Sequence, residues 1–203
     1  YSPGSTIKPI VALSALENNI INTKFKVKCT GKMELYGQTF HCWKEKGHGW
    51  MSLKNAMKQS CDTYFYEVAR LLGVDRLNIT AEKFGLGKKV LGEYFDTEKK
   101  GLFPNTKWKK NNLGKGWVLG ETLITGIGQG YIQSTPLQLC MMTAQIANGG
   151  YAIKPKIIVD SNPISYEDAK QSMESQLLFD SDSELLRDKK LFKYKKNIKI
   201  VQE

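Results

Sequence analysis

The stretch from Ser2 to Pro9, with the sequence SPGSTIKP, is the feature that most constrains how this chain can fold. Proline is excluded from a helix interior because its ring clashes with the carbonyl four residues back, so a helix that contains Pro9 must begin at about Ser5. Apolar residues then recur with helical spacing as far as the polar pair at 18–19. Because residues three apart share a helix face, this helix start is expected to bring Ser5 and Lys8 together.

Ser5 and Lys8 have the chemistry of a nucleophile and its general base. A serine hydroxyl becomes a good nucleophile when a base takes its proton, and a lysine can do this when its amine is neutral. Backbone N–H groups at the helix start would also stabilise an oxyanion formed there. The same spacing arises by chance in a chain of 203 residues, with the lysine then a solvated surface residue. The pair alone leaves both interpretations open.

The composition indicates one globular domain with a hydrophobic core and a basic surface. Hydrophobic residues make up 41% of the chain, and the formal net charge is +10. Lysines cluster between Lys88 and Lys115 and again after Arg187. Such clusters occur on surfaces that meet nucleic acid, anionic lipid or an acidic polymer, but also on ordinary solvated faces. The sequence has no apolar run of about 18 residues, and it opens inside a motif without Met. We therefore expect a soluble piece of a longer protein.

Periodicity and capping residues predict helices separated by loops. Helices are expected from Ser5 to residues 18–19, from about Ser52 with a break at Ser60–Asp62, from Thr63 to Leu72, from Asp75 to Phe84, from Thr135 to residues 149–150, and over Ser165–Leu178. Strands or an ordered loop are expected at 23–40, a strand pair or extended arm at Tyr151–Val159, and a strand start at Ile198–Val201. Residues 85–131 hold ten of the 18 glycines and little periodicity, which predicts one long functional loop.

Three segments together resemble one known family. Ser-x-x-Lys, Ser-x-Asn and Lys-Thr-Gly motifs mark penicillin-binding proteins and class A β-lactamases. SPGSTIKP resembles the nucleophile motif of class B penicillin-binding proteins, SCDTYFYEVA their second motif, and GIGQGYIQSTPLQL the stretch before their third. With aspartate at Asp62 and WKEKGHG upstream, the chain is most similar to the elongation-type group, penicillin-binding protein 2. The resemblance extends to about Val159.

The resemblance implies an α/β fold of the penicillin-binding and serine β-lactamase type, in which an antiparallel sheet packs with a helical subdomain. This chain would supply mainly the helical part and few strands. Residues 1–203 would then be a partial transpeptidase domain. Within it, 1–159 would form the helical core with the first two motifs and a possible zinc site, and 160–203 a helix and a basic tail that lead to sheet strands outside the chain.

The resemblance also implies site residues and an activity. Ser5 would attack the penultimate D-alanine of a peptidoglycan stem peptide, or a β-lactam, to form an acyl-enzyme, and Lys8 would be its general base. Ser60 would relay a proton, and Asp62 would help to hold the substrate peptide. The amine of a second stem peptide would then release the acyl group as a cross-link during cell elongation. Neither Lys-Thr-Gly nor Lys-Ser-Gly occurs in the sequence, so we expect this piece alone to lack turnover.

The resemblance further implies where the parent protein works and with what. It would lie at the bacterial inner membrane on the periplasmic side, work with a membrane glycosyltransferase of the elongation machinery, and bind β-lactams but no nucleic acid. A β-lactamase or a β-lactam sensor is the alternative within the same fold. A basic zinc-dependent nucleic-acid-binding module is the alternative from another class. It gives no reason for the presence of Ser5, Lys8, Ser60 and Asp62 at their motif positions.

Three of the four cysteines form a pattern with a histidine. The pattern runs Cys29, Cys42, His48, Cys61, with twelve, five and twelve residues between successive members. Three thiolates and an imidazole are a complete ligand set for a structural zinc. A metal there would also fix the second motif, because Cys61 lies inside it.

Two alternatives to zinc remain open at this point. Disulfides persist outside the inner membrane, so Cys29 and Cys42 could bridge, or all the thiols could be free. His41 is a possible substitute for His48 as a ligand. Cys140 falls on an apolar helix face and is expected to be a core residue.

Overall fold

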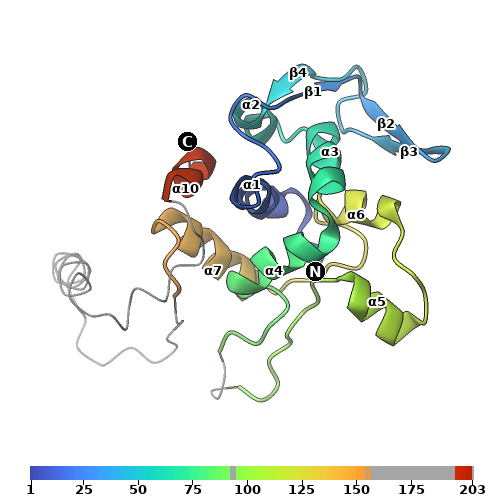
Figure 1. Cartoon of the computed structure of the whole chain (residues 1–203). Coiled ribbons are helices and arrows are strands. Elements are labelled where there is room, and N and C mark those ends of the chain that lie inside the picture. The colour runs from blue at the N-terminus through green and yellow to red at the C-terminus, as the bar shows by residue number, and fades with distance from the viewer. Residues whose placement is uncertain (92–94, 154, 156–194, 203) are drawn as a thin grey trace.

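The computed structural model describes residues 1–91, 95–153, 155 and 195–202 (Figure 1). In chain order its elements are the 3-10 helix η1 (Gly4–Ile7), α1 (Lys8–Glu17), β1 (Lys26–Cys29), β2 (Lys32–Leu35), β3 (Gln38–His41), β4 (Gly49–Ser52), α2 (Leu53–Lys58), α3 (Asp62–Leu72), α4 (Val74–Lys83), α5 (Thr106–Leu113), α6 (Leu119–Thr125), α7 (Pro136–Ala147) and α10 (Lys195–Gln202). None of the helices in these ranges is long and apolar enough to cross a lipid bilayer.

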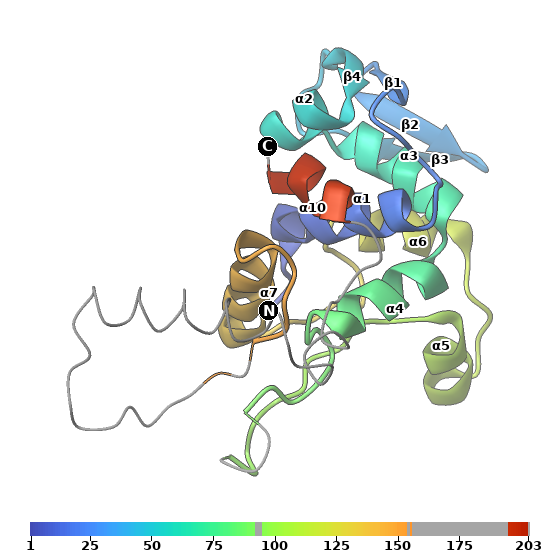
Figure 2. The same ribbon diagram turned by 60° about the vertical axis from the view of Figure 1, so that its left-hand side comes forward.

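Helix α1 is the centre of the described core. Helices α3, α4 and α10 pack around it (Figures 1 and 2). A helix that is apolar on all sides must be covered on all sides, and α1 meets this condition. Its fully buried apolar residues are Ile10, Val11, Ala12, Leu13 and Ala15. Lys8 is the first residue of this helix, so its side chain starts from a fixed backbone inside the core.

The break between α2 and α3 occurs where the sequence predicts it. Ser52 caps α2 by accepting a hydrogen bond from the Asn55 backbone N–H, and α3 begins at Asp62. Between them Ser60 has φ +50°, a left-handed conformation that few residues other than glycine adopt. Such backbone conformations cost about 1–3 kcal/mol and persist where the surrounding structure enforces them.

The strands form two small antiparallel pairs on one side of the helices, confirming that residues 23–40 include strands. Strand β1 pairs with β4, with Cys29 opposite Gly49, and β2 pairs with β3, with Lys32 opposite His41. The backbone N–H of Cys42 donates to the Gly31 carbonyl at 2.8 Å. This bond ties the end of the β2–β3 pair to the turn that follows β1.

The prediction of one long loop over 85–131 is wrong, because this segment contains α5 and α6. Each helix has a local cap: the Asn105 side chain accepts from the Trp108 N–H, and the Glu121 side chain accepts from the Val118 N–H. Both helices are short and are flanked by glycines, so they show too little apolar periodicity to be predicted from the sequence. Gly126 belongs to a close packing of α6 on α3, where a Cβ would collide with Ala69.

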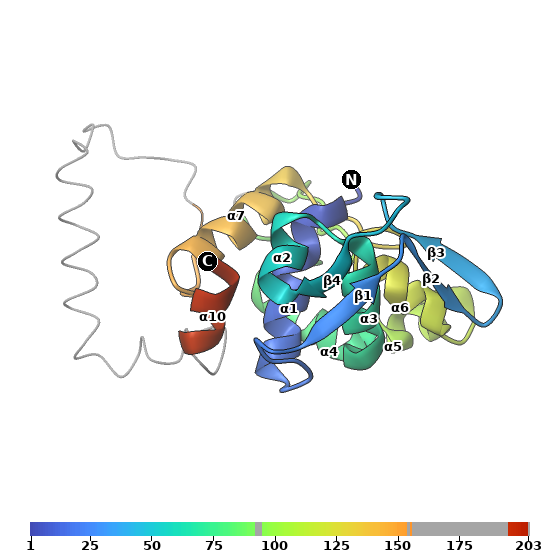
Figure 3. The same ribbon diagram turned by 90° about the horizontal axis from the view of Figure 1, so that it is seen from above.

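The prediction that a strand starts at Ile198–Val201 is also wrong, because these residues lie in helix α10. Ile198 is buried, Asn197 Nδ2 donates to Glu17 on α1, and Gln202 Nε2 donates to the Ile146 carbonyl on α7. The apolar residues at 198 and 201 share a helix face, so packing against α1 and α7 favours the helix. Seen from above, α10 and α7 lie together on the side opposite β2 and β3 (Figure 3).

Three further expectations have different outcomes. Cys140 is exposed on α7, so its assignment to the core is wrong. The helix expected at Ser165–Leu178 lies outside the described residues. Of the arm expected at Tyr151–Val159, only 151–153 and 155 are described.

Candidate active site

Ser5, Ser60 and Lys8 form one hydrogen-bonded chain. Ser5 lies on η1, and its Oγ accepts a hydrogen bond from Ser60 Oγ at 3.0 Å. Lys8 Nζ donates to Ser60 Oγ at 2.9 Å. A hydroxyl is both donor and acceptor and turns freely, so rotation of both hydroxyls reverses the direction of the chain. The geometry therefore links the Ser5 hydroxyl to the Lys8 amine through one serine.

This link corrects the expectation that Ser5 and Lys8 meet directly. Among the hydrogen bonds of the described residues, Ser5 Oγ pairs with Ser60, and Lys8 Nζ points into the segment that joins α2 to α3. Ser5 lies in the 3-10 turn η1 and Lys8 begins α1, and the Ser60 hydroxyl accepts from Lys8 Nζ and donates to Ser5 Oγ. Ser60, from the break between α2 and α3, therefore bridges the two side chains.

Lys8 is a buried cation with a full set of partners. Its three ammonium N–H donors correspond to three acceptors: the Ser60 carbonyl at 2.9 Å, Ser60 Oγ at 2.9 Å and Asp62 Oδ1 at 2.7 Å. The residue is only 2% exposed, and the amine lies 5.5 Å from the centre of the Phe65 ring. Its position is therefore set by the 60–62 segment.

Trp43 is part of the site although sequence reasoning missed it. Its backbone N–H donates to Asp62 Oδ2 at 3.0 Å, and its indole N–H donates to the Gln59 and Ser60 carbonyls, both at 3.1 Å. The ring also contacts His48 edge to face, with centroids 5.1 Å apart. Trp43 is the first residue of the WKEKGHG stretch, which the resemblance used without assigning the tryptophan a role, so a sequence signal for it was available.

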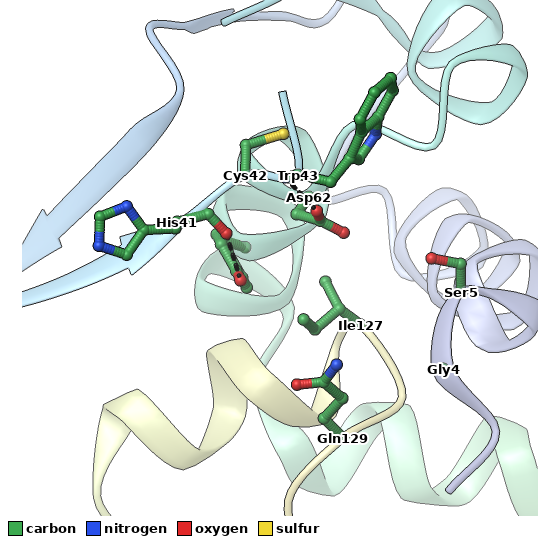
Figure 4. Close-up of a pocket in the computed structure, with 9 residues that line it drawn as sticks. Gly4, Ser5, His41, Cys42, Trp43, Asp62, Ile127 and Gln129 are labelled. Atoms are coloured by element: carbon green, nitrogen blue, oxygen red, sulfur yellow. Dashed lines mark hydrogen bonds between the residues drawn. The ribbon is translucent and has the colours of Figure 1, made fainter. Parts of the chain in front are cut away.

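A cavity of about 460 Å³ opens beside Ser5. Its lining residues are Gly4, Ser5, His41, Cys42, Trp43, Asp62, Tyr66, Ile127 and Gln129, and Figure 4 shows Ser5 on one side of it with Ile127 and Gln129 on another. Three segments that are distant in sequence therefore converge on the hydroxyl. A cavity with a few polar groups next to an activated hydroxyl is the usual form of a small-molecule or peptide site.

The GIGQG loop reaches this cavity because it binds the start of η1. The Gly4 N–H donates to the Gly128 carbonyl at 2.9 Å, and Ser2 Oγ donates to the same oxygen at 2.9 Å. Gly128 has φ +76°, and a Cβ there would collide with the Gly4 backbone. Glycine is thus required for the close approach that places Ile127 and Gln129 in the wall.

The predicted Cys/His set comes together as a cluster. Its ligand atoms, from Cys29, Cys42, His48 and Cys61, all lie within 4.8 Å of one another. His48 Nδ1 is 3.5 Å from both Cys29 Sγ and Cys42 Sγ, and the three thiols are buried. A tetrahedral zinc with Zn–S bonds of about 2.3 Å separates its thiolates by about 3.8 Å. The cluster therefore fits such an ion in composition and nearly in size.

Burial and hydrogen bonding shift the pKa values of these thiols in opposite directions. Burial raises the pKa of Cys29, but its hydrogen bonds with Thr63 and His48 outweigh burial and lower that pKa to about 6. Burial raises the pKa of Cys61 far above its ordinary value. A bound divalent cation would favour the thiolate form of both residues, because metal ligation deprotonates a thiol.

The alternatives for the cluster can be compared with this geometry. All four cysteines are free thiols in the structure, so the bridge between Cys29 and Cys42 is not formed in it. His41 is exposed at the end of β3 and borders the cavity, whereas His48 faces the thiols. His48 Nε2 is buried and has no hydrogen-bond partner in the structure.

A serine hydroxyl linked through a second serine to a buried lysine, at the edge of a cavity, defines a site of the serine acyl-transfer class. Comparison with known proteins then gives the family. Residues 1–187 match the family described as penicillin-binding protein transpeptidase domain. The chain belongs to this family, and its helix-rich structure with few strands is part of the α/β transpeptidase fold.

Three relatives illustrate the similarity to individual proteins. The chain is 40% identical over 160 residues to peptidoglycan D,D-transpeptidase MrdA of Acinetobacter baumannii, covering 78% of this chain and 24% of the relative. Pseudomonas aeruginosa PBP2, solved in complex with WCK 5153, matches with a TM-score of 0.74 and 42% identity over 80% of this chain and 39% of the other. Helicobacter pylori PBP2, solved in complex with MreC, matches with a TM-score of 0.74 and 30% identity over 91% of this chain and 36% of the other. The chain thus spans about a quarter of the length of the curated relative.

Proposed function

We propose that this chain is the part of a peptidoglycan D,D-transpeptidase that carries the nucleophile, acting in cell elongation. The observation that carries the proposal is the chain of hydrogen bonds from Ser5 through Ser60 to Lys8, at the edge of a cavity. Membership of the transpeptidase family and similarity to a D,D-transpeptidase support it. The aligned residues cover 24% of the curated relative, so we assign the activity to the parent protein, with this piece alone expected to be inactive.

In the first half-reaction Ser5 Oγ attacks the carbonyl carbon of the penultimate D-alanine of a stem peptide. For this step Lys8 must first lose one ammonium proton to solvent; the proton of Ser5 then passes to Ser60, whose own proton passes to the neutral Lys8 amine. The new C–O bond forms as the bond between carbonyl carbon and leaving nitrogen breaks. The proton returns through Ser60 to that nitrogen, and D-alanine departs. A β-lactam carbonyl reacts in the same way, except that the ring nitrogen stays attached to the acyl group.

In the second half-reaction the amine of another stem peptide attacks the acyl-enzyme carbonyl. Lys8 accepts the amine's proton and returns one through Ser60 to Ser5 Oγ as the ester C–O bond breaks. The products are a peptide cross-link and the free serine. Both half-reactions use the same two hydrogen bonds in opposite directions.

We also propose a structural zinc at the Cys29, Cys42, His48 and Cys61 cluster. The cluster's donor set and compactness support it. His48 contacts the Trp43 ring, and Cys61 precedes Asp62, so the four ligands would tie the strand ends to the α2–α3 break. When bound, zinc would act as a cross-link within the fold, with no part in the acyl transfer.

The setting of the parent protein is part of the same proposal. We place it at the inner membrane on the periplasmic side, with stem peptides and β-lactams as ligands and a membrane glycosyltransferase of the elongation machinery as partner. The complex of the H. pylori relative with MreC is consistent with such an assembly. Nucleic-acid binding is not proposed, because the family match spans the Cys/His residues and the lysine cluster at 88–115.

The transpeptidase proposal is tested by supplying the parent protein with preformed, uncross-linked peptidoglycan strands. Muramidase digestion and mass spectrometry should reveal cross-linked muropeptides, and prior treatment with a penicillin should remove them. Because deacylation then needs an amine acceptor, the penicillin adduct should persist in buffer. Rapid hydrolysis of the penicillin without any cross-linked product would instead identify a β-lactamase.

A further inference from the structure

The β1–β4 pair has one face against the core and one face in solvent. In an antiparallel pair, residues directly opposite each other point to the same face, and the two faces alternate along each strand. Val27 lies opposite Met51, which is buried, so these two residues face the core. Lys28 lies opposite Trp50, and Lys26 is two residues from Lys28 on the same strand. These last three side chains are exposed and form the outer face of the pair.

The side chains of this outer face have no partners in the part of the chain that the structure describes. Trp50 is 65% exposed, and among the described residues its indole N–H has no hydrogen bond and its ring no aromatic contact. Within the same ranges, neither Lys26 nor Lys28 forms an ion pair. A single exposed residue of either kind is ordinary. Here a flat aromatic ring and two unpaired ammonium groups share one face, which suits a ligand with apolar faces and negative charges.

The segment around this face is strongly basic. Residues 20–59 contain eight lysines and two glutamates, a formal charge of +6. One of these glutamates, Glu34, is already bound by Lys32 at 2.7 Å. Clustered charge of one sign raises the local concentration of ligands of the opposite sign. The outer face of the β1–β4 pair therefore favours a ligand that carries several negative charges.

A groove of about 300 Å³ continues this face between β1 and β2. From the chain around these two strands, its lining residues are Phe25, Lys26, Val27, Lys28, Lys32 and Met33. Glu67 of α3 also lines the groove, but Arg70 binds its two carboxylate oxygens, each at 2.7 Å. The groove therefore combines apolar side chains with lysines whose charge is not cancelled by the glutamate. Such a concave site suits a ligand with small apolar groups beside its charges.

An uncross-linked peptidoglycan strand has the chemistry that this surface fits. The C–H faces of its sugar rings are apolar and pack on a flat aromatic ring such as that of Trp50. Its stem peptides end in carboxylates, which pair with ammonium groups, and its acetyl groups are small enough for the groove. An anionic membrane would also attract tryptophan and lysine, but a flat bilayer surface would leave the groove unfilled. The groove thus favours the strand over the membrane.

We propose that the outer face of the β1–β4 pair and the adjoining groove bind an uncross-linked peptidoglycan strand. Trp50 packs against a sugar ring, and Lys26 and Lys28 pair with stem-peptide carboxylates. The inference rests on the proposed transpeptidase function and adds a second binding surface to it. A strand held there stays near Ser5 between reactions, which raises its effective concentration at the nucleophile. A penicillin makes no contact with this surface, so its reaction with Ser5 is independent of it.

The test measures binding of the parent protein to immobilised, uncross-linked peptidoglycan strands. A Ser5→Ala background prevents acylation, so the signal reports affinity alone. Trp50→Ala should weaken binding by about 5-fold, as expected for an aromatic contact residue. The double variant Lys26→Gln/Lys28→Gln should weaken it by about 10-fold, and blocking the carboxylates of the strands by amidation should have a similar effect on the unsubstituted surface. Absence of binding before any of these surface changes, or unchanged binding after all of them, would overturn the proposal.

The chain offers matched controls for both changes. Lys107→Gln/Lys110→Gln removes the same charge from two exposed lysines of α5, which lies at the other end of the molecule from β1 and β4 (Figures 1 and 2). Tyr36→Ala removes an aromatic ring that is 88% exposed at the turn between β2 and β3. Both controls should bind strands within about 2-fold of the unsubstituted surface, as is usual for surface changes outside a site. Equal losses in the two lysine pairs would assign the effect to net charge and overturn the proposal.

Two further measurements separate this surface from a membrane contact and from the catalytic site. Variants that bind strands normally but lose binding to phosphatidylglycerol vesicles would identify a membrane surface and overturn the proposal. With Ser5 intact, Trp50→Ala should be acylated by a penicillin within about 2-fold of the wild-type rate, because the substitution lies on an exposed face. A large loss of acylation would assign its effect to the fold and overturn the proposal. Strand binding by a wild-type protein that a penicillin does not acylate would support this surface and overturn the proposed function instead.

Discussion

Replacing Ser5 with Ala in the parent protein should abolish covalent labelling by a fluorescent penicillin. Alanine removes the one atom that forms the bond to the β-lactam carbonyl, and no other hydroxyl occupies its place. Ser60 Oγ is the nearest candidate, but its backbone is held by Lys8 and Trp43. Labelling measured on denaturing gels should fall by at least about 1,000-fold, since removal of a nucleophile eliminates covalent catalysis.

The control for this experiment is Ser2→Ala, in the same stretch of chain. The Ser2 hydroxyl binds the Gly128 carbonyl, which keeps its bond from the Gly4 N–H when Ser2 is replaced. Ser2→Ala should therefore label within about 3-fold of the wild-type protein. Full labelling of Ser5→Ala would mean that the nucleophile has been assigned to the wrong residue.

Replacing Cys61 with Ser should remove zinc from the parent protein and destabilise its transpeptidase domain. Cys61 is fully buried, and it supplies one of four ligands directly before Asp62. Loss of a structural metal site is among the few single changes that cost more than about 4 kcal/mol. For a domain of this size that corresponds to a fall of about 10 °C in the midpoint of thermal unfolding. Zinc by elemental analysis should fall from about one equivalent to near zero.

Cys140→Ser is the matched control, because Cys140 is the exposed cysteine outside the cluster. It should keep the zinc and the unfolding midpoint of the wild-type protein. The zinc proposal would be wrong if the wild-type protein contained less than half an equivalent of zinc and mass spectrometry found a bridge between Cys29 and Cys42. Chelation of zinc from the wild-type protein should reproduce the stability loss of Cys61→Ser.

The elements that the sequence predicted well are those with strong local signals. Ser52, Thr135 and Gly73 mark helix ends where the structure has them, and the break at Ser60 follows from the loss of periodicity there. The missed helices α5 and α6 are short and surrounded by glycines. Their caps, at Asn105 and Glu121, are local signals that span three residues, but no apolar periodicity accompanies them.

For the site, the sequence predicted which residues belong to it better than it predicted the hydrogen bonds between them. The motif spacing identified Ser5, Lys8, Ser60 and Asp62, and the structure brings all four together. Helical spacing alone suggested a direct contact of Ser5 with Lys8, but the Ser60 hydroxyl, from the break between α2 and α3, bridges them. Trp43 was missed because its role comes from tertiary contacts with the 59–62 segment. Likewise, the hydrogen bond to Asp62 Oδ2 comes from Trp43, nineteen residues earlier, and the one to Oδ1 comes from Lys8.

The most direct test of the central claim is a crystal structure of the parent protein after reaction with a penicillin. We predict continuous electron density from Ser5 Oγ to the opened β-lactam carbonyl. Ser60 Oγ should remain within hydrogen-bond distance of both Ser5 Oγ and Lys8 Nζ, and Asp62 should still bind Lys8. Density for the adduct on any other residue, or an intact penicillin beside an unmodified Ser5, would contradict the assignment of this site.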